Sequence, residues 1–215
     1  MFAELRELLR SGAIRRHQLG AKYLLTPTSY YILAGNKMNF KIKQIIWFVT
    51  GVLACIGLDQ WTKALAVSRL KGQPPFVILD GVFEFFYSEN RGAAFGMLQG
   101  RQGFFFVIGL VVIAAVIYYL CRVPADRRYW PLTFCVLLIA SGAVGNMIDR
   151  VTQGYVVDFL YFKLINFPIF NVADCYVTVA TAVIIVLFLF HYRDEDLAVF
   201  SLRGHDSLQN RDKEE

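Results

Sequence analysis

Three long stretches of this sequence contain no Asp, Glu, Lys or Arg: residues 103–121, 129–148 and 175–192. A helix of about 20 residues, at about 1.5 Å per residue, crosses the hydrocarbon core of a bilayer. A fourth apolar stretch, 45–58, is shorter, but apolar residues resume at 64–67. The sequence therefore predicts an all-α membrane protein with four transmembrane helices, at about 45–67, 103–121, 129–148 and 172–192.

The charge distribution agrees with a membrane protein. Hydrophobic residues make up 56% of the chain and charged residues only 18%, which is unlike a soluble domain. The net charge is +5, but the basic residues lie between the spans and not in a stripe with stacking aromatics, so no nucleic-acid partner is predicted. Nine Lys and Arg lie in 38–44, 122–130 and 193–215, against six in 66–102 and 150–171. The positive-inside rule then predicts cytoplasmic termini and two outward-facing longer connections.

The two ends of the chain are predicted to lie outside the membrane domain. Residues 1–37 are basic and irregular, and their apolar part is interrupted by Pro27, so they are too short to span. Met38 is typical of a natural start, and 1–37 is then an N-terminal extension that is either an upstream-start artefact or disordered. Residues 38–192 form the four-span domain, and 193–215 are expected to be a charged, weakly ordered cytoplasmic tail.

The first outward connection predicts a small β-hairpin. Two β-favouring runs, 76–79 and 82–87, flank Asp80-Gly81, a dipeptide typical of tight hairpin turns. An ordinary loop is the alternative. The hairpin is rich in aromatic residues, which are stable among lipid headgroups. We expect Phe85 and Phe86 to clamp a substrate against the membrane surface.

Polar residues concentrate in 142–174, between the third and fourth spans. Gly142, Asn146, Asp149 and Arg150 recur at i, i+4, i+7 and i+8, so they share one face of a helix. We expect this face to bring Asp149 near the other carboxylates at one surface of the membrane. Asp149 is expected to be neutralised by the adjacent cation Arg150 or by neighbouring backbone N–H groups.

Two further aspartates have no cation beside them in sequence. Asp174 lies three residues into the last span, and Asn171 stands where an N-cap is expected. Asp158 lies in the apolar run Val156–Phe159. Two carboxylates held close share one proton, so the pair can accept a proton from water and also support an oxyanion, with no metal or cofactor. Catalysis, ion-coupled transport and a structural role (a cap for Asp174, a turn for Asp158) all stay open on this evidence.

The remaining polar and sulfur-containing residues give weaker indications. Asp59 and Lys63 are spaced i, i+4 and predict an ion pair near a helix end; direct chemistry by Lys63 is the alternative. The four cysteines have no metal or disulfide spacing and are interpreted as small apolar filler. Ser141 has no histidine at its depth to act as a base, which argues against a serine protease.

Five motifs together resemble one family, the signal peptidase II family of bacterial lipoprotein signal peptidases. They are Asp59-Gln-Trp-Thr-Lys63, Asn90-Arg-Gly-Ala-Ala-Phe-Gly96, Gly145-Asn-Met-Ile-Asp-Arg150, Val156-Val-Asp-Phe159 and Phe170-Asn-Val-Ala-Asp174. Each motif alone is weak, but the five occur in the family's order at the ends of the four predicted spans. Cys175 departs from the pattern, because a smaller residue is expected there.

The resemblance implies a multi-pass enzyme of the cell inner membrane with an outward β-cradle. It implies a monomeric aspartic endopeptidase, inhibited by cyclic peptides such as globomycin, that cleaves lipidated prolipoproteins before the lipid-modified cysteine. Asp158 and Asp174 are implied to be catalytic. The implied substrate-binding residues are Asn90, Asn146, Arg150 and Asn171, and the implied supporting residues are Asp59, Lys63, Gly92 and Asp149. The implied partners are these precursors and membrane lipid.

Overall fold

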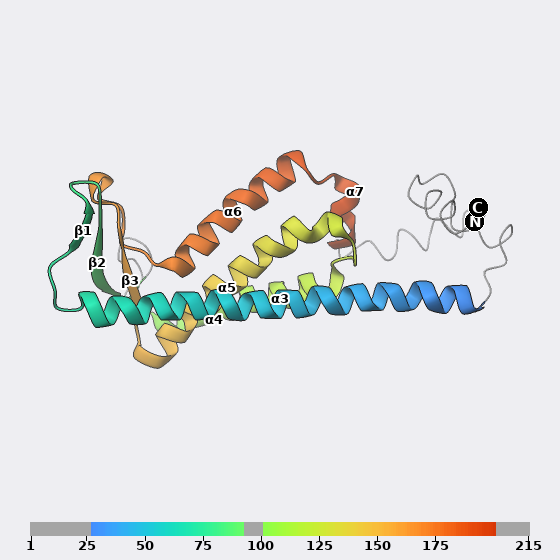
Figure 1. Ribbon diagram of the computed structural model, residues 1–215, viewed down its shortest axis with the longest axis horizontal. Coiled ribbons are helices and arrows are strands. Elements are labelled where there is room, and N and C mark those ends of the chain that lie inside the picture. The colour runs from blue at the N-terminus through green and yellow to red at the C-terminus, as the bar shows by residue number, and fades with distance from the viewer. Residues whose placement is uncertain (1–26, 93–100, 201–215) are drawn as a thin grey trace. The chain divides into compact units, whose positions relative to one another are not determined.

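The computed structural model describes residues 27–92 and 101–200 (Figure 1). The chain divides into two compact units, 1–44 and 45–215. The described part of the first unit is the beginning of helix α3 (Pro27–Leu70). The second unit contains the rest of α3, three further long helices and a three-stranded sheet. The motif residues 93–96 lie outside the described residues.

The four predicted spans are confirmed. Besides α3, the long helices are α4 (Gln102–Arg122), α5 (Trp130–Gln153) and α6 (Val172–Phe190). All four are long and apolar enough to cross a membrane. Many of their apolar side chains face outward: Leu53, Val111 and Phe190 are 65%, 62% and 83% exposed. Such surfaces are stable in lipid, where no water has to be displaced from them.

Two helix boundaries differ from the prediction. Helix α3 begins at Pro27, so residues 27–37 are helical and not irregular. Proline is tolerated in the first turn, where its missing N–H has no partner to lose. Helix α5 continues past Ile148 to Gln153, so Asp149 and Arg150 belong to the helix itself. It ends where Gly154 adopts a left-handed conformation, with φ of 80°, which glycine adopts without steric cost.

The predicted hairpin is confirmed and is part of a larger sheet. Strands β1 (Phe76–Leu79) and β2 (Phe83–Asn90) are antiparallel around the turn at Gly81, whose φ is 67°. A third strand, β3 (Val156–Tyr161), pairs antiparallel with β2 and gives the order β1-β2-β3. Asp158 therefore lies on a strand and not in a turn, opposite Ser88.

Glycines allow the helices of the second unit to approach closely. A Cβ added to Gly51 of α3 would lie 2.5 Å from a methyl carbon of Leu137 in α5. A Cβ added to Gly142 of α5 would lie 2.5 Å from the carbonyl oxygen of Ala173 at the start of α6. Because small residues are typical of helix contacts in membranes, these glycines determine how near α3 and α6 come to α5.

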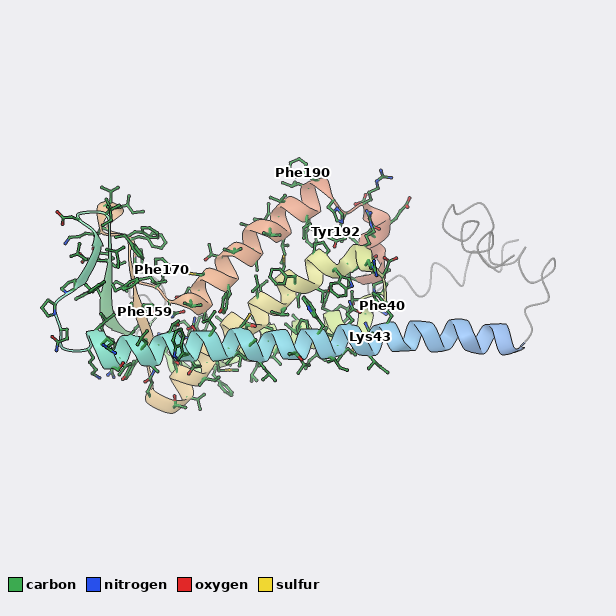
Figure 2. All side chains as sticks on the ribbon, in the orientation of Figure 1. Phe40, Lys43, Phe159, Phe170, Phe190 and Tyr192 are labelled. Atoms are coloured by element: carbon green, nitrogen blue, oxygen red, sulfur yellow. The ribbon has the colours of Figure 1, made fainter. Side chains whose placement is uncertain are left out.

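The start of the predicted solvated tail is folded. Residues after α6 form a short helix, α7 (Asp194–Leu197), and a 3-10 turn, η4 (Ala198–Phe200). The Arg128 guanidinium in the turn η2 (Arg127–Tyr129) donates to both carboxylate oxygens of Asp196, at 2.7 and 2.6 Å. This end of the helices lies opposite the sheet, as Figure 2 shows from Tyr192 at one end and Phe159 at the other. Residues 201–215 lie outside the described residues.

Candidate active site

The two aspartates predicted to be catalytic are joined by one asparagine. Asp158 is on β3 and Asp174 is in the first turn of α6. The side chain of Asn171 donates to Asp158 Oδ1 at 2.6 Å, and its backbone N–H donates to Asp174 Oδ2 at 3.1 Å. Asp158 and Asn171 are almost wholly buried, at 2% and 0% exposed. The fold thus brings the predicted pair to the same small polar site.

The start of α6 explains where Asp174 lies. Asn171 is the N-cap, and its Oδ1 accepts from the backbone N–H of Asp174 at 3.1 Å. Asp174 in turn accepts from the N–H of Asn171, which completes a capping box. The capping role predicted from sequence is therefore confirmed. It uses one oxygen of the carboxylate and leaves the other for a different partner.

Each carboxylate also accepts from a second asparagine on another element. Asn146 of α5 donates to Asp174 Oδ1 at 2.8 Å, and Asn90 at the end of β2 donates to Asp158 Oδ2 at 2.9 Å. The Oδ1 atom of Asn90 accepts from the N–H of Gly92 at 2.9 Å. Since that bond requires Oδ1 to face Gly92, the Asn90 amide N–H₂ must face Asp158.

Below the acid pair lies a buried charge cluster centred on Lys63. Its Nζ atom is 2.9 Å from Asp59 Oδ2 and 3.0 Å from Asp149 Oδ2. It also donates to Asn146 Oδ1 at 2.8 Å. The predicted pair of Asp59 and Lys63 is confirmed. Of the two partners expected for Asp149, Arg150 is not the cation that pairs with it, because Lys63 of α3 does so across the helix interface. The other expected partner, a backbone N–H group, is present at Val157.

This cluster connects the helices and strand that carry the acids. Asp59 accepts from the backbone N–H of Ala173 at 2.9 Å, beside Asp174. Asp149 accepts from the backbone N–H of Val157 at 3.2 Å, beside Asp158. Gln60 donates to Asp149 at 2.9 Å, a role that sequence reasoning missed although Gln60 lies inside the first motif. Asp59 and Asp149 thus connect α3 and α5 to the residues next to Asp174 and Asp158.

Arg150 points away from this cluster. It donates to the carbonyl oxygens of Asn146 and Gly92, both at 3.3 Å, and its guanidinium lies 4.4 Å from the ring centroid of Phe105 in α4. A cation over an aromatic face is stabilised by the ring quadrupole. Phe105 was missed at the sequence level, where the second span offered no polar feature to single it out.

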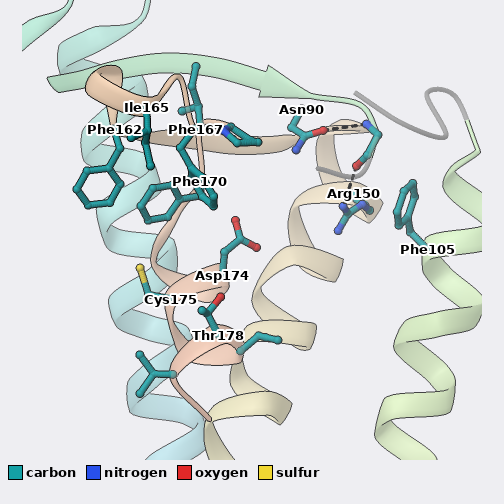
Figure 3. A pocket seen from close by; sticks show the side chains of 15 residues that line it. Asn90, Phe105, Arg150, Phe162, Ile165, Phe167, Phe170, Asp174, Cys175 and Thr178 are labelled. Atoms are coloured by element: carbon teal, nitrogen blue, oxygen red, sulfur yellow. Dashed lines mark hydrogen bonds between the residues drawn. The ribbon is translucent and has the colours of Figure 1, made fainter. Parts of the chain in front are cut away.

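The site opens into a cavity of about 750 Å³ (Figure 3). Its polar wall includes Asn90, Arg150 and Asp174, and the side chain of Asp174 points into the space between α5 and α6. Most of the rest is apolar: Phe105, Phe162, Ile165, Phe167, Pro168, Ile169, Phe170, Val177 and Val179. Cys175 also lines it. The hairpin residues Phe85 and Phe86, expected to clamp a substrate, are not among the lining residues.

Comparison with known proteins gives the family. The family model described as "Signal peptidase (SPase) II" matches residues 51–190. This chain belongs to the signal peptidase II family. The resemblance seen in the five motifs is confirmed, and the chain is a multi-pass membrane peptidase.

Individual relatives of this signal peptidase II chain support the same assignment. The lipoprotein signal peptidase of Streptococcus thermophilus is 43% identical over 136 residues, 63% of this chain and 88% of that protein. That of Clostridium tetani is 38% identical over 161 residues, 74% and 99% of the two chains. A solved bacterial membrane enzyme at 1.9 Å resolution superposes with a TM-score of 0.61 and 30% identity, covering 69% of this chain and 96% of the other.

The environment of Asp158 in this signal peptidase II chain favours a bound proton. Burial, followed by the charge of Asp174, raises the pKa of Asp158 to about 7, although the hydrogen bonds from Asn90 and Asn171 lower it. The acid pair can therefore carry one proton near neutral pH. Within residues 27–92 and 101–200, no three His, Cys, Asp or Glu side chains gather in a way that could hold a metal ion.

Proposed function

We propose that this signal peptidase II member is an aspartic endopeptidase that removes the signal peptide of prolipoproteins by cleaving before the diacylglyceryl-modified cysteine. The observation that carries this proposal is the junction at Asn171, which hydrogen-bonds to both Asp158 and Asp174, while Asp174 lines a large, mainly apolar cavity. An enzyme that hydrolyses an amide bond next to a lipid needs acid groups for the hydrolysis and an apolar wall for the lipid. The names of the relatives from Streptococcus thermophilus and Clostridium tetani support the substrate class.

In the proposed reaction Asp174 is the base and Asp158 carries the shared proton. Asp174 faces the cavity, where its carboxylate accepts a proton from the water that attacks the scissile carbonyl carbon. Asp158, protonated near neutral pH, hydrogen-bonds to the developing oxyanion. The tetrahedral intermediate then collapses, the C–N bond breaks, and the amine takes a proton from the pair. The products are a carboxylic acid and an amine, and the acids regain their starting protonation.

The four predicted substrate-binding residues divide into two roles in this proposal. Asn146 donates a hydrogen bond to Asp174 and Asn171 donates one to Asp158, so these two asparagines fix the orientation of the carboxyl groups. Arg150 lines the cavity and is the cation available to a peptide carbonyl. Asn90 lines the cavity and also holds Asp158.

The apolar wall suits the lipid part of the substrate. Phe162 to Phe170 and the first turns of α6 form this wall, which can exclude water from acyl chains. The resemblance to the family leads us to expect a monomer in the cell inner membrane. The charge asymmetry of the connections favours an orientation with both termini cytoplasmic and the sheet on the outer side. Globomycin-type cyclic peptides are expected to compete for the cavity.

The test is cleavage of a diacylglyceryl-bearing precursor by purified protein in detergent and lipid. Asp158→Asn and Asp174→Asn each remove one acid while keeping the hydrogen-bonding shape, and each should lower turnover by at least about 10²–10⁴-fold. Asp80→Asn is the matched control, because Asp80 is exposed in the hairpin turn and asparagine is equally suited to that turn. Near-normal turnover by either acid variant would reject the proposed pair.

A further inference from the structure

An ion-pair cluster at the end of β2 is not used by the proposed chemistry. Its centre is Glu89, the residue before Asn90. The Glu89 carboxylate accepts from Lys71 Nζ at 2.9 Å, from the Tyr87 hydroxyl at 3.2 Å and from the Arg91 guanidinium at 3.3 Å. These donors come from the turn after α3, from β2 and from the residue that follows β2. One carboxylate therefore joins three neighbouring segments.

The residues that follow Glu89 contact Asp158, one of the two proposed catalytic acids, and Arg150. Asn90 follows it and donates to Asp158. Gly92 donates its N–H to the Asn90 side chain and accepts from Arg150 through its carbonyl. In the sheet, Glu89 is opposite Val157, the neighbour of Asp158. The direction of the Asn90 side chain thus depends on the backbone course of residues 89–92.

Arg91 is held on two sides. Its guanidinium bonds to Glu89 and lies 5.4 Å from the ring centroid of Tyr155, just before β3. On the far side of Glu89, Lys71 is held in the same way, 5.4 Å from the ring centroid of Tyr87. The cluster therefore fixes the point where the chain leaves β2, which is also where Asn90 turns toward Asp158.

We propose that Glu89 is a positioning residue for the acid pair, which fixes the end of β2 through Lys71 and Arg91 and thereby keeps Asn90 hydrogen-bonded to Asp158. The proposal rests on the proposed function, since it matters only if Asp158 takes part in the chemistry. The hydrogen bond from Lys71 holds the pKa of the Glu89 carboxyl below its usual range. Glu89 therefore stays ionised across the neutral pH range.

The test compares Glu89→Gln with Glu84→Gln. Glu84 is the control, because it lies on the same strand and is also paired with a lysine, Lys163 at 3.1 Å, but it is opposite Tyr161, away from Asn90. Its side chain is more buried than that of Glu89, at 6% against 29% exposed, so it is the more demanding control for a general loss of structure. Exposed ion pairs are weak one by one, so Glu89→Gln should lower kcat by about three- to tenfold, with KM little changed. Glu84→Gln should leave kcat within about twofold of the wild type, because Glu84 pairs with Lys163 and lies opposite Tyr161, away from Asn90.

The pH profile separates positioning from general loss of structure. A weaker bond from Asn90 favours the neutral form of Asp158, so in Glu89→Gln the limb of the profile that belongs to Asp158 should move to higher pH. The other charged groups around Asp158 are Asp174 of α6, Lys63 of α3 and Arg150 of α5, and neither substitution removes them. The limb should therefore stay in place in Glu84→Gln.

Two further measurements complete the test. Arg91→Gln should reproduce the effect, and the double variant should add little to either single one, because both act through one contact. If Glu89→Gln folds too poorly to assay, added salt is used to weaken the Glu89 ion pairs, because salt screens exposed pairs. Added salt should then shift the Asp158 limb of the pH–rate profile more in the wild type than in Arg91→Gln.

A Glu89→Gln enzyme that keeps the wild-type pH profile and loses no more activity than Glu84→Gln overturns the proposal. A salt-independent limb in the wild type does the same. Neither result touches the acid pair, whose own test is the inactivity of Asp158→Asn. An active Asp158→Asn enzyme would reject both proposals together.

Discussion

Replacing Lys63 by methionine tests whether the buried cluster holds the fold together. Lys63 is 3% exposed, and its two partners Asp59 and Asp149 are 0% and 3% exposed. The Lys63→Met variant leaves both carboxylates buried without a cation, and removing one partner of a buried ion pair costs about 3–5 kcal/mol. That is a large part of the 5–15 kcal/mol that typically stabilises a domain.

The expected change can be measured as an unfolding temperature in detergent. For a chain of this size 1 kcal/mol corresponds to about 2–4 °C, so Lys63→Met should unfold about 6–20 °C below the wild type. Activity should fall as well, because Lys63 orients the Asn146 amide that donates to Asp174. Lys71→Met is the control for the unfolding temperature alone: its pair with Glu89 is half-exposed, and such pairs contribute about 0–1 kcal/mol. A Lys63→Met protein that unfolds within about 2 °C of the wild type would contradict this reasoning.

Three further outcomes are expected. Gly145→Ala places a Cβ 2.6 Å from Asp59 Oδ2 and should lower both the unfolding temperature and activity, whereas Gly57→Ala meets nothing within 4 Å and should be neutral or stabilising; equal behaviour of the two would refute this. The pKa of Asp158 is raised to about 7, so the stability that Asp158 contributes is full below the ordinary pKa of an aspartate and is lost as pH rises toward 7. Because the proposed reaction needs Asp158 protonated, kcat/KM should also fall above about pH 7 in a pH–rate profile. Arg128→Met should speed amide hydrogen exchange in residues 193–200, which unchanged exchange would disprove.

The local features of the sequence were sufficient to predict much of the fold. The four spans follow from the lengths of the uncharged runs, and the hairpin follows from Asp80-Gly81 between β-favouring residues. The cap at Asn171 follows from its position just before an apolar run. Each of these depends on neighbouring residues in one segment, and such short-range preferences are largely independent of the rest of the chain.

The partners of the polar residues were decided only by the tertiary structure. Asp149 pairs with Lys63 and not with its neighbour Arg150, and it binds Gln60, which is 89 residues away in sequence. Phe105 contributes to the site from a span that is otherwise featureless in sequence. The sequence determined that acids lie at the ends of apolar helices. Which cation, amide or ring each one meets depends on how those helices and β3 pack, because contacts between distant segments exist only once the whole unit has assembled.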